Sequence, residues 1–181
     1  TANYITIKGI IVRNVANRGT SVMAGIYISS GKHHILLDSV ESHDNQGFGI
    51  LLDSTNNVTI QNSHIHHNGS DGIIVEGTSA YTTIQNNEIN NNNHTGGIAL
   101  FNNSGSSTYN TYTKILNNKI YANSNQGIWV FESKYVLIKG NESYLNGATG
   151  IQIETGSWYV ILDGNTLHDN CVNFEHEGGS W

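Results

Sequence analysis

The fold is decided by residues 56–77, NNVTIQNSHIHHNGSDGIIVEG, because the same pattern returns farther along the chain. Residues 81–101 read YTTIQNNEINNNNHTGGIALF, and residues 135–155 read YVLIKGNESYLNGATGIQIET. Each copy contains two short units in which apolar residues alternate with other residues, and the second unit usually follows a glycine. Self-similarity at a period of about 20 to 50 residues indicates a repeat architecture whose repeats pack against their neighbours.

The repeated units have the length and alternation of strands. The Gly-Ile-x-Ile unit places its first apolar residue at Ile26, Ile50, Ile73, Ile98, Ile128, Ile151 and, in a degenerate copy, Phe174. A second unit recurs in phase at Ile5, Ile35, Val58, Thr82, Thr113, Val136 and Val160, and a weaker apolar position follows at Ile65, Ile89, Ile120 and Leu167. Gly, Asn, Ser or Asp bound each unit, which leaves no room for a helix of about 10 residues. The pattern therefore predicts three short strands per repeat.

The fold class that this pattern predicts is all-β: a right-handed single-stranded parallel β-helix of about seven coils of 23–25 residues, two of them longer. Each strand would pair with its equivalent one coil later, about 4.8 Å away, so that inward residues stack on residues of the same type. Parallel strands joined by crossovers favour the right-handed coil. We expect residues 1–181 to form one β-helix domain, either complete in itself or a segment of a longer protein.

Asparagine occupies fixed positions in the repeat. Eight residues after an inward position of the second unit come Asn45, Asn68, Asn92, Asn123, Asn146 and Asn170, and a second column contains Asn87, Asn118, Asn141 and Asn165. Asparagine tolerates turn conformations, and its amide can bridge to the copies above and below. We therefore predict that both columns are structural ladders rather than catalytic groups.

Composition excludes several classes of partner. The net charge of −6 with 8 Lys and Arg leaves no basic stripe, so nucleic acid is not an expected partner. No apolar run reaches the roughly 18 residues of a membrane span. The single Cys171 excludes an intramolecular disulfide. Scarce lysine and abundant Asn, Ser, Thr and Gly are typical of bacterial surface and secreted proteins, so we expect an extracellular or cell-surface location.

The outer face of the Gly-Ile-x-Ile sheet carries the main candidate site. Its columns bring together aromatic residues predicted to bind substrate, namely Tyr27, Phe101, Trp129 and Phe131. They also contain carboxylates predicted to act in catalysis or to bind calcium, Asp53 and Glu76 on one side of the aromatic residues and Glu154, Glu175 and Glu177 on the other. Carboxylates on adjacent coils would stand about 5 Å apart, which suits a retaining glycosidase pair or a calcium-binding pair. The pattern favours an exposed site that binds a polysaccharide, with calcium as the one possible cofactor. The alternative is that these carboxylates are only solvated and that the aromatic residues lie beneath a loop.

Three further features remain as candidates. Stacking is expected in a column that contains Tyr81, Tyr112, Tyr135 and Tyr159, either as self-packing along a turn or as a contact strip. Coil alignment also places His43 over His66, Glu41 over His64 and Asp44 over His67, a group able to bind a transition metal or share a proton near neutral pH. No known metal-motif spacing supports that cluster, so no metal ligand is predicted. Long insertions at residues 13–25 and 101–114 are expected to project as loops.

The repeat NN-[TV]-x-I-x-N-N…N-x-x-x-G-I-x-[IV] resembles that of the right-handed parallel β-helix proteins typified by pectate lyases, which include epimerases, hydrolases and non-enzymatic carbohydrate-binding members. The resemblance covers the whole chain and implies that the Gly-Ile-x-Ile sheet lines the substrate cleft. It does not supply a catalytic motif: the polygalacturonase sequences NTD, DD, GHG and RIK are absent, and residues 174–178, FEHEG, are only faintly similar to an alginate-epimerase motif.

Two classes of function therefore stay open. The first is a protein that binds or processes an extracellular polysaccharide, as a lyase, epimerase, hydrolase or binding module. The second is a structural or self-assembling rod whose copies associate end to end.

Overall fold

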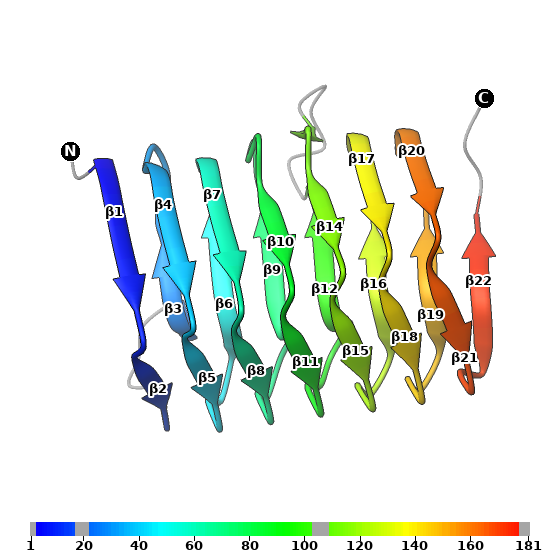
Figure 1. Ribbon diagram of the computed structural model, residues 1–181, viewed down its shortest axis with the longest axis horizontal. Helices are drawn as coiled ribbons and strands as arrows, with labels where there is room; N and C mark the ends of the chain where they lie inside the picture. Colours follow the sequence, from blue (N-terminus) through cyan, green and yellow to red (C-terminus); the bar gives the residue numbers. More distant parts are fainter. Residues whose placement is uncertain (1–2, 17–21, 103–108, 178–181) are drawn as a thin grey trace.

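The computed structural model describes residues 3–16, 22–102 and 109–177, which form a rod of coils stacked in chain order along its long axis (Figure 1). The first strand, β1 (Asn3–Lys8), and the last, β22 (Val172–His176), lie at opposite ends of this rod. Within these residues no helix is long and apolar enough to cross a membrane.

Three parallel sheets run along the rod, and each coil contributes to all three. The first sheet contains β1, β4 (His33–Asp38), β7 (Asn56–Gln61), β10 (Thr83–Gln85), β13 (Asn110–Thr111), β14 (Lys114–Leu116), β17 (Ser133–Lys139) and β20 (Trp158–Asp163). The second contains β2 (Ile11–Arg13), β5 (Glu41–His43), β8 (His64–His66), β11 (Glu88–Asn90), β15 (Lys119–Tyr121), β18 (Glu142–Tyr144) and β21 (Thr166–His168). The third, which carries the Gly-Ile-x-Ile units, contains β3 (Ala24–Ile28), β6 (Phe48–Asp53), β9 (Ile73–Glu76), β12 (Gly96–Phe101), β16 (Gln126–Val130), β19 (Thr149–Ile153) and β22.

Pairing between equivalent strands aligns the inward apolar side chains. In the third sheet Ile73 pairs with Ile50 and with Ile98, and all three are buried. In the first sheet Ile84 is aligned in the same way with the coils on either side. Because each buried isoleucine stacks on its equivalent, one continuous core fills the inside of the coil. The predicted parallel β-helix and its register are confirmed.

Both predicted asparagine ladders are present, and all their members except Asn165 and Asn170 are buried. In the longer ladder the side-chain nitrogen of Asn45 donates to Asn68 over 2.8 Å, and Asn68 donates to Asn92 over 2.9 Å. In the shorter ladder Asn118 receives such a bond from Asn87 over 3.0 Å. These amides satisfy backbone groups at the bends, where the strand ladder ends.

A third ladder was not predicted, and it corrects one expectation. Thr55 and Ser79 bridge successive coils, and the backbone nitrogen of Ser79 donates to Oδ1 of Asn110 over 3.2 Å. Asn110 is buried in β13, so the polar insertion predicted to project over residues 101–114 has already rejoined the sheet by Asn110. Residues 103–108 and 17–21 lie outside the described residues.

Residues at the sheet boundaries adopt left-handed backbone conformations. The tyrosine column has φ values of 55° at Tyr81, 54° at Tyr112, 57° at Tyr135 and 56° at Tyr159. Adjacent rings of these four are stacked with centroids 4.9 Å apart, as predicted. A positive φ is uncommon outside glycine, so each coil accepts local strain in order to bend sharply.

Candidate functional site

The carboxylates predicted at one end of the third sheet lie in register on its outer face. Asp53 pairs with Glu76 across adjacent strands. The Tyr27 hydroxyl donates a hydrogen bond of 3.2 Å to Oδ2 of Asp53. Burial, and then the charge of Asp53, raise the pKa of half-buried Glu76. A carboxyl group whose pKa is raised therefore stands beside a second carboxyl group that is hydrogen-bonded to a tyrosine, an arrangement that can support acid–base chemistry.

The aromatic group on the same face is half-buried rather than exposed. Phe101, Trp129 and Phe131 have ring centroids 5.4 to 5.6 Å apart and ring planes within 25° of one another. Phe101 and Trp129 also pack beside the buried outward residues Ile74 and Ala99 in a second apolar cluster. Because the ring faces are turned toward one another and the side chains are half-buried, only part of each ring is accessible.

The second predicted group of carboxylates, Glu154, Glu175 and Glu177, lies on the coils of β19 and β22. Glu175 pairs with Gln152 at the far end of the face. The side-chain amide of Gln152 donates to Oε1 of Glu154 over 2.8 Å. Burial, followed by the hydrogen bond and charge of Glu177, raises the pKa of Glu175. The aromatic residues separate this group from the Asp53–Glu76 pair.

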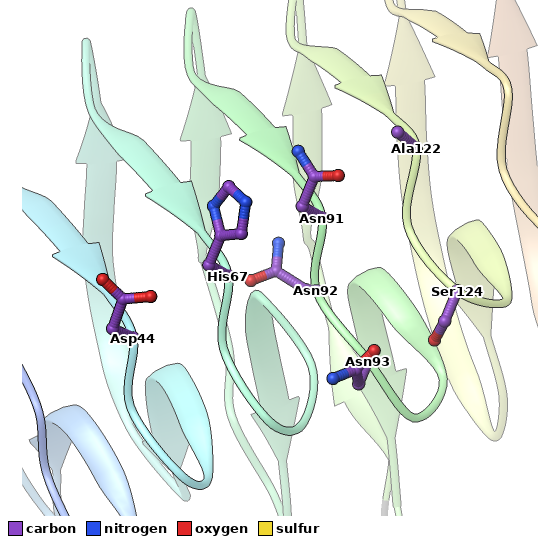
Figure 2. A pocket seen from close by; sticks show the side chains of 7 residues that line it. All are labelled: Asp44, His67, Asn91, Asn92, Asn93, Ala122 and Ser124. Carbon is purple, nitrogen blue, oxygen red and sulfur yellow. The ribbon is translucent and has the colours of Figure 1, made fainter.

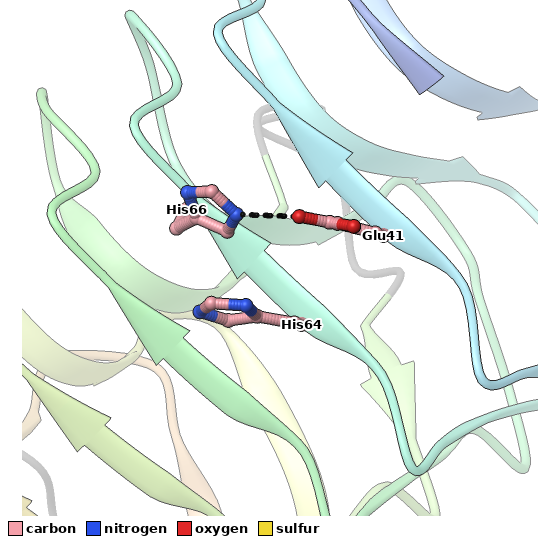
Figure 3. A group of neighbouring side chains, drawn as sticks. All are labelled: Glu41, His64 and His66. Carbon is pink, nitrogen blue, oxygen red and sulfur yellow. Dashed lines mark hydrogen bonds and ion pairs between the residues drawn. The ribbon is translucent and has the colours of Figure 1, made fainter. Parts of the chain in front are cut away.

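A different cluster lies on the outer face of the second sheet, where β5 and β8 are paired. Glu41 is aligned with His64, and His43 with His66. One ligand atom from each of Glu41, His64 and His66 lies within 4.8 Å of the other two. Figure 3 shows the three side chains converging, with Nε2 of His66 3.1 Å from Oε1 of Glu41. The amide of Asn90, on the next strand, lies 3.0 Å from Nε2 of His64.

The electrostatics of this cluster favour the states that bind metal. The hydrogen bond from His66 lowers the pKa of the Glu41 carboxyl, which keeps it ionised. Burial, and then the neighbouring His66, lower the pKa of His64 and keep its ring neutral near pH 7. Metal ligands must be deprotonated, so an ionised carboxylate and a neutral imidazole are the required forms.

The donor set determines which ions fit. Two imidazoles and one carboxylate suit zinc, copper, nickel or iron(II) better than calcium or magnesium, which prefer oxygen ligands alone. The sequence analysis identified this group by coil alignment but did not predict a metal ligand in it. Glu41 precedes His64 by a whole coil, so the signal was not a short motif but the alignment of residues 41–45, ESHDN, with residues 64–68, HIHHN.

A groove of about 420 Å³ lies directly beside this cluster, at the bend that follows the second sheet. Figure 2 shows that Asp44, His67 and Asn91 come from successive coils along it. These residues have left-handed φ values of 53° each. They directly follow the strands that carry His43, His66 and Asn90, so the groove and the histidine cluster share one bend.

Comparison with known proteins gives a family match over nearly the whole chain. A family model described as "Periplasmic copper-binding protein (NosD)" matches residues 2–181. No curated protein matches the chain in sequence.

Solved structures show the same fold at low identity. The A-module of mannuronan C-5 epimerase AlgE6 from Azotobacter vinelandii gives a TM-score of 0.71 and 24% identity, over 77% of this chain and 36% of that one. The periplasmic alginate epimerase AlgG gives 0.66 and 16%, over 99% of this chain and 44% of that one. Pectate lyase Pel9A gives 0.58 and 12%, over 76% of this chain and 46% of that one. The chain therefore spans less than half the length of each structure, and the predicted resemblance to pectate-lyase-like β-helix proteins is confirmed for the fold.

Proposed function

The chain belongs to the NosD family, and we propose that it binds a transition-metal ion, copper first of all, through Glu41, His64 and His66. The observation that carries this proposal is the convergence of three ligand atoms within 4.8 Å on the outer face of the second sheet. The description of the family, periplasmic and copper-binding, supports both the ion and a location outside the cytoplasm.

The local geometry explains how these residues would hold the ion. Glu41 and His66 already contact each other across adjacent strands, so binding would replace the proton between them with the metal. His64 lies two residues before His66 on the same strand, and alternation places both on the outer face. Glu41, His64 and His66 lie on paired strands of the sheet, so the backbone that carries them is already ordered before a metal binds.

The test is a titration of the purified protein with Cu(II), and separately with Zn(II), with the bound metal measured after equilibrium dialysis. We expect one tight equivalent of copper and a loss of at least about 100-fold in affinity in the double variant His64→Ala/His66→Ala.

The matched control for this titration is His33→Ala/His34→Asn, which removes the same number of histidines from the first sheet. Asparagine suits the backbone at His34, because Asn57 occupies the equivalent position with φ 53°. Equal copper affinity in the two double variants would contradict the proposal.

A second candidate function concerns the outer face of the third sheet. We propose that this face binds or processes a polysaccharide, with uronate polymers as the first class to test. The observations that favour it are the Tyr27–Asp53 hydrogen bond, the raised pKa of Glu76 and the adjacent aromatic cluster. The names of the epimerases and the pectate lyase that share the fold support the same substrate class. Calcium would be needed to bridge the carboxylates of the face to an anionic polymer.

The test is binding of alginate and oligogalacturonate fragments with and without calcium, followed by assay for unsaturated chain ends. We expect Glu76→Gln to reduce calcium-dependent retention at least about tenfold, with Glu88→Gln on the second sheet as the control. Retention that is absent, or equal in the two variants, would contradict this candidate. The remaining alternative would then be a structural or self-assembling rod.

A further inference from the structure

A fourth potential ligand lies against the three clustered groups. The ring of His43 stacks on that of His66 with centroids 4.9 Å apart and planes 6° from parallel. Nε2 of His43 is 3.9 Å from Oε1 of Glu41. Nε2 of His43 therefore lies on the side of the same Glu41 oxygen that contacts Nε2 of His66, and it would have to move toward that oxygen to share a metal ion at the usual distance of about 2.0 to 2.1 Å.

The other ring nitrogen of His43 is hydrogen-bonded to a residue that lines the groove. Nδ1 of His43 lies 2.7 Å from Oδ2 of Asp44. An ionised carboxylate only accepts hydrogen bonds, so Nδ1 must be the donor. In a neutral ring the proton at Nδ1 leaves the lone pair on Nε2, which is the nitrogen on the side of Glu41.

His66 is held in a related way. Its Nδ1 lies 2.8 Å from Nδ1 of His67. An imidazole nitrogen can donate or accept, so His67 is able to support His66 in either tautomer. That property matters because Nε2 of His66 donates to Glu41 and would have to lose its proton to become a ligand.

These contacts arise from the bend itself. At this bend the last side chain of a strand contacts the side chain of the next residue, which has the left-handed backbone, and the same contact joins Asn90 to Asn91 and His168 to Asp169. The contact between the last strand residue and the next residue is therefore a repeated local geometry. At His43 and His66 this contact involves side chains that also lie beside the Glu41–His64–His66 cluster.

We propose that Asp44 and His67 are positioning residues of the metal site and that His43 is its fourth ligand. This inference rests on the proposed metal function and extends it to the groove. Partners that orient ligating histidines typically change metal affinity by about 10- to 100-fold when they are removed.

The first experiment compares Asp44→Ala with Asp169→Ala. Both residues occupy the same bend and bind a histidine through Nδ1, but only Asp44 borders the cluster. Alanine suits this backbone, because Ala122 has φ 52° in the equivalent position. We expect Asp44→Ala to lower Cu(II) affinity about 10- to 100-fold and Asp169→Ala to leave it unchanged, with partial rescue by Asp44→Asn, whose side-chain oxygen still accepts a hydrogen bond.

The second measurement is made without metal. Long-range ¹H–¹⁵N correlation spectra should show the Nδ1–H form of the His43 ring in the wild type and a mixture of tautomers in Asp44→Ala. A merely structural role for Asp44 would lower the melting temperature without changing the tautomer. Unchanged affinity together with an unchanged tautomer in Asp44→Ala would overturn the positioning role.

The fourth ligand and His67 are tested by electron paramagnetic resonance of the copper complex. We expect hyperfine coupling to three nitrogens in the wild type and to two in His43→Gln, and a loss of affinity in His67→Asn. Three nitrogens in His43→Gln would overturn the ligand assignment, and unchanged affinity in His67→Asn would overturn its positioning role. If His64→Ala/His66→Ala binds copper as the wild type does, the proposed function is contradicted as well. If that double variant loses copper but the variants at Asp44, His67 and His43 behave as the wild type, only this inference is contradicted.

Discussion

Asn92 illustrates how a polar side chain can be as deeply buried as the isoleucines of the core. Its Oδ1 accepts from the backbone and from the side chain of Asn68, over 3.2 and 2.9 Å. Its Nδ2 donates to the carbonyl oxygen of Ile65 and to Asn123, each over 3.1 Å. Every polar atom of the side chain therefore has a partner, which removes the cost of burying it.

We expect Asn92→Ala to lower the free energy of unfolding by about 3 kcal/mol, because it leaves several buried donors and acceptors without partners. The measurement is urea denaturation followed by circular dichroism. The control is Asn93→Ala, which changes the neighbouring asparagine, whose side chain is exposed. A loss of similar size in both variants would show that the ladder contributes little to stability.

At the scale of the element, the bend before the first sheet combines backbone strain with ring stacking. Tyr112 has φ 54°, and its ring lies 4.9 Å from the rings of Tyr81 and Tyr135. The same bend accepts Asn57 with φ 53° and His34 with φ 55°. The backbone conformation is thus constant along the column, while the side chain varies.

Two substitutions at Tyr112 separate these contributions. Both Tyr112→Asn and Tyr112→Val remove the stacked ring, but a β-branched residue is strained at positive φ. We expect the valine variant to be less stable than the asparagine variant by about 1 to 2 kcal/mol, although valine is the better strand former. Thermal and urea denaturation of the pair measure this difference, and a valine variant at least as stable as the asparagine variant would argue against strain at this bend.

At the scale of the whole molecule, the sequence was sufficient for the coil, the register and two ladders. The reason is that one period applies to every coil, so a single correct alignment of Ile50, Ile73 and Ile98 fixes all the others. The third ladder was missed because its members, Thr55, Ser79 and Asn110, are of different residue types.

The candidate sites could be predicted only in part. Coil alignment correctly placed Glu41 over His64, but it could not show how the side chains turn toward each other. It also placed Phe101 and Trp129 side by side without showing that their rings stack and are half-buried. Side-chain direction depends on packing against neighbouring side chains, and these differ from coil to coil.

The pairing of β5 with β8 sets a limit on how such a rod can change in evolution. An in-frame insertion of one coil of unrelated sequence elsewhere would lengthen the protein and leave this pair intact, because each coil contacts only its neighbours. The same insertion between β5 and β8 would move Glu41 and His43 about 4.8 Å farther from His64 and His66, beyond the reach of a shared ion. The proposed metal site therefore requires these two coils to remain adjacent, and it places no such requirement on the coils farther along the rod.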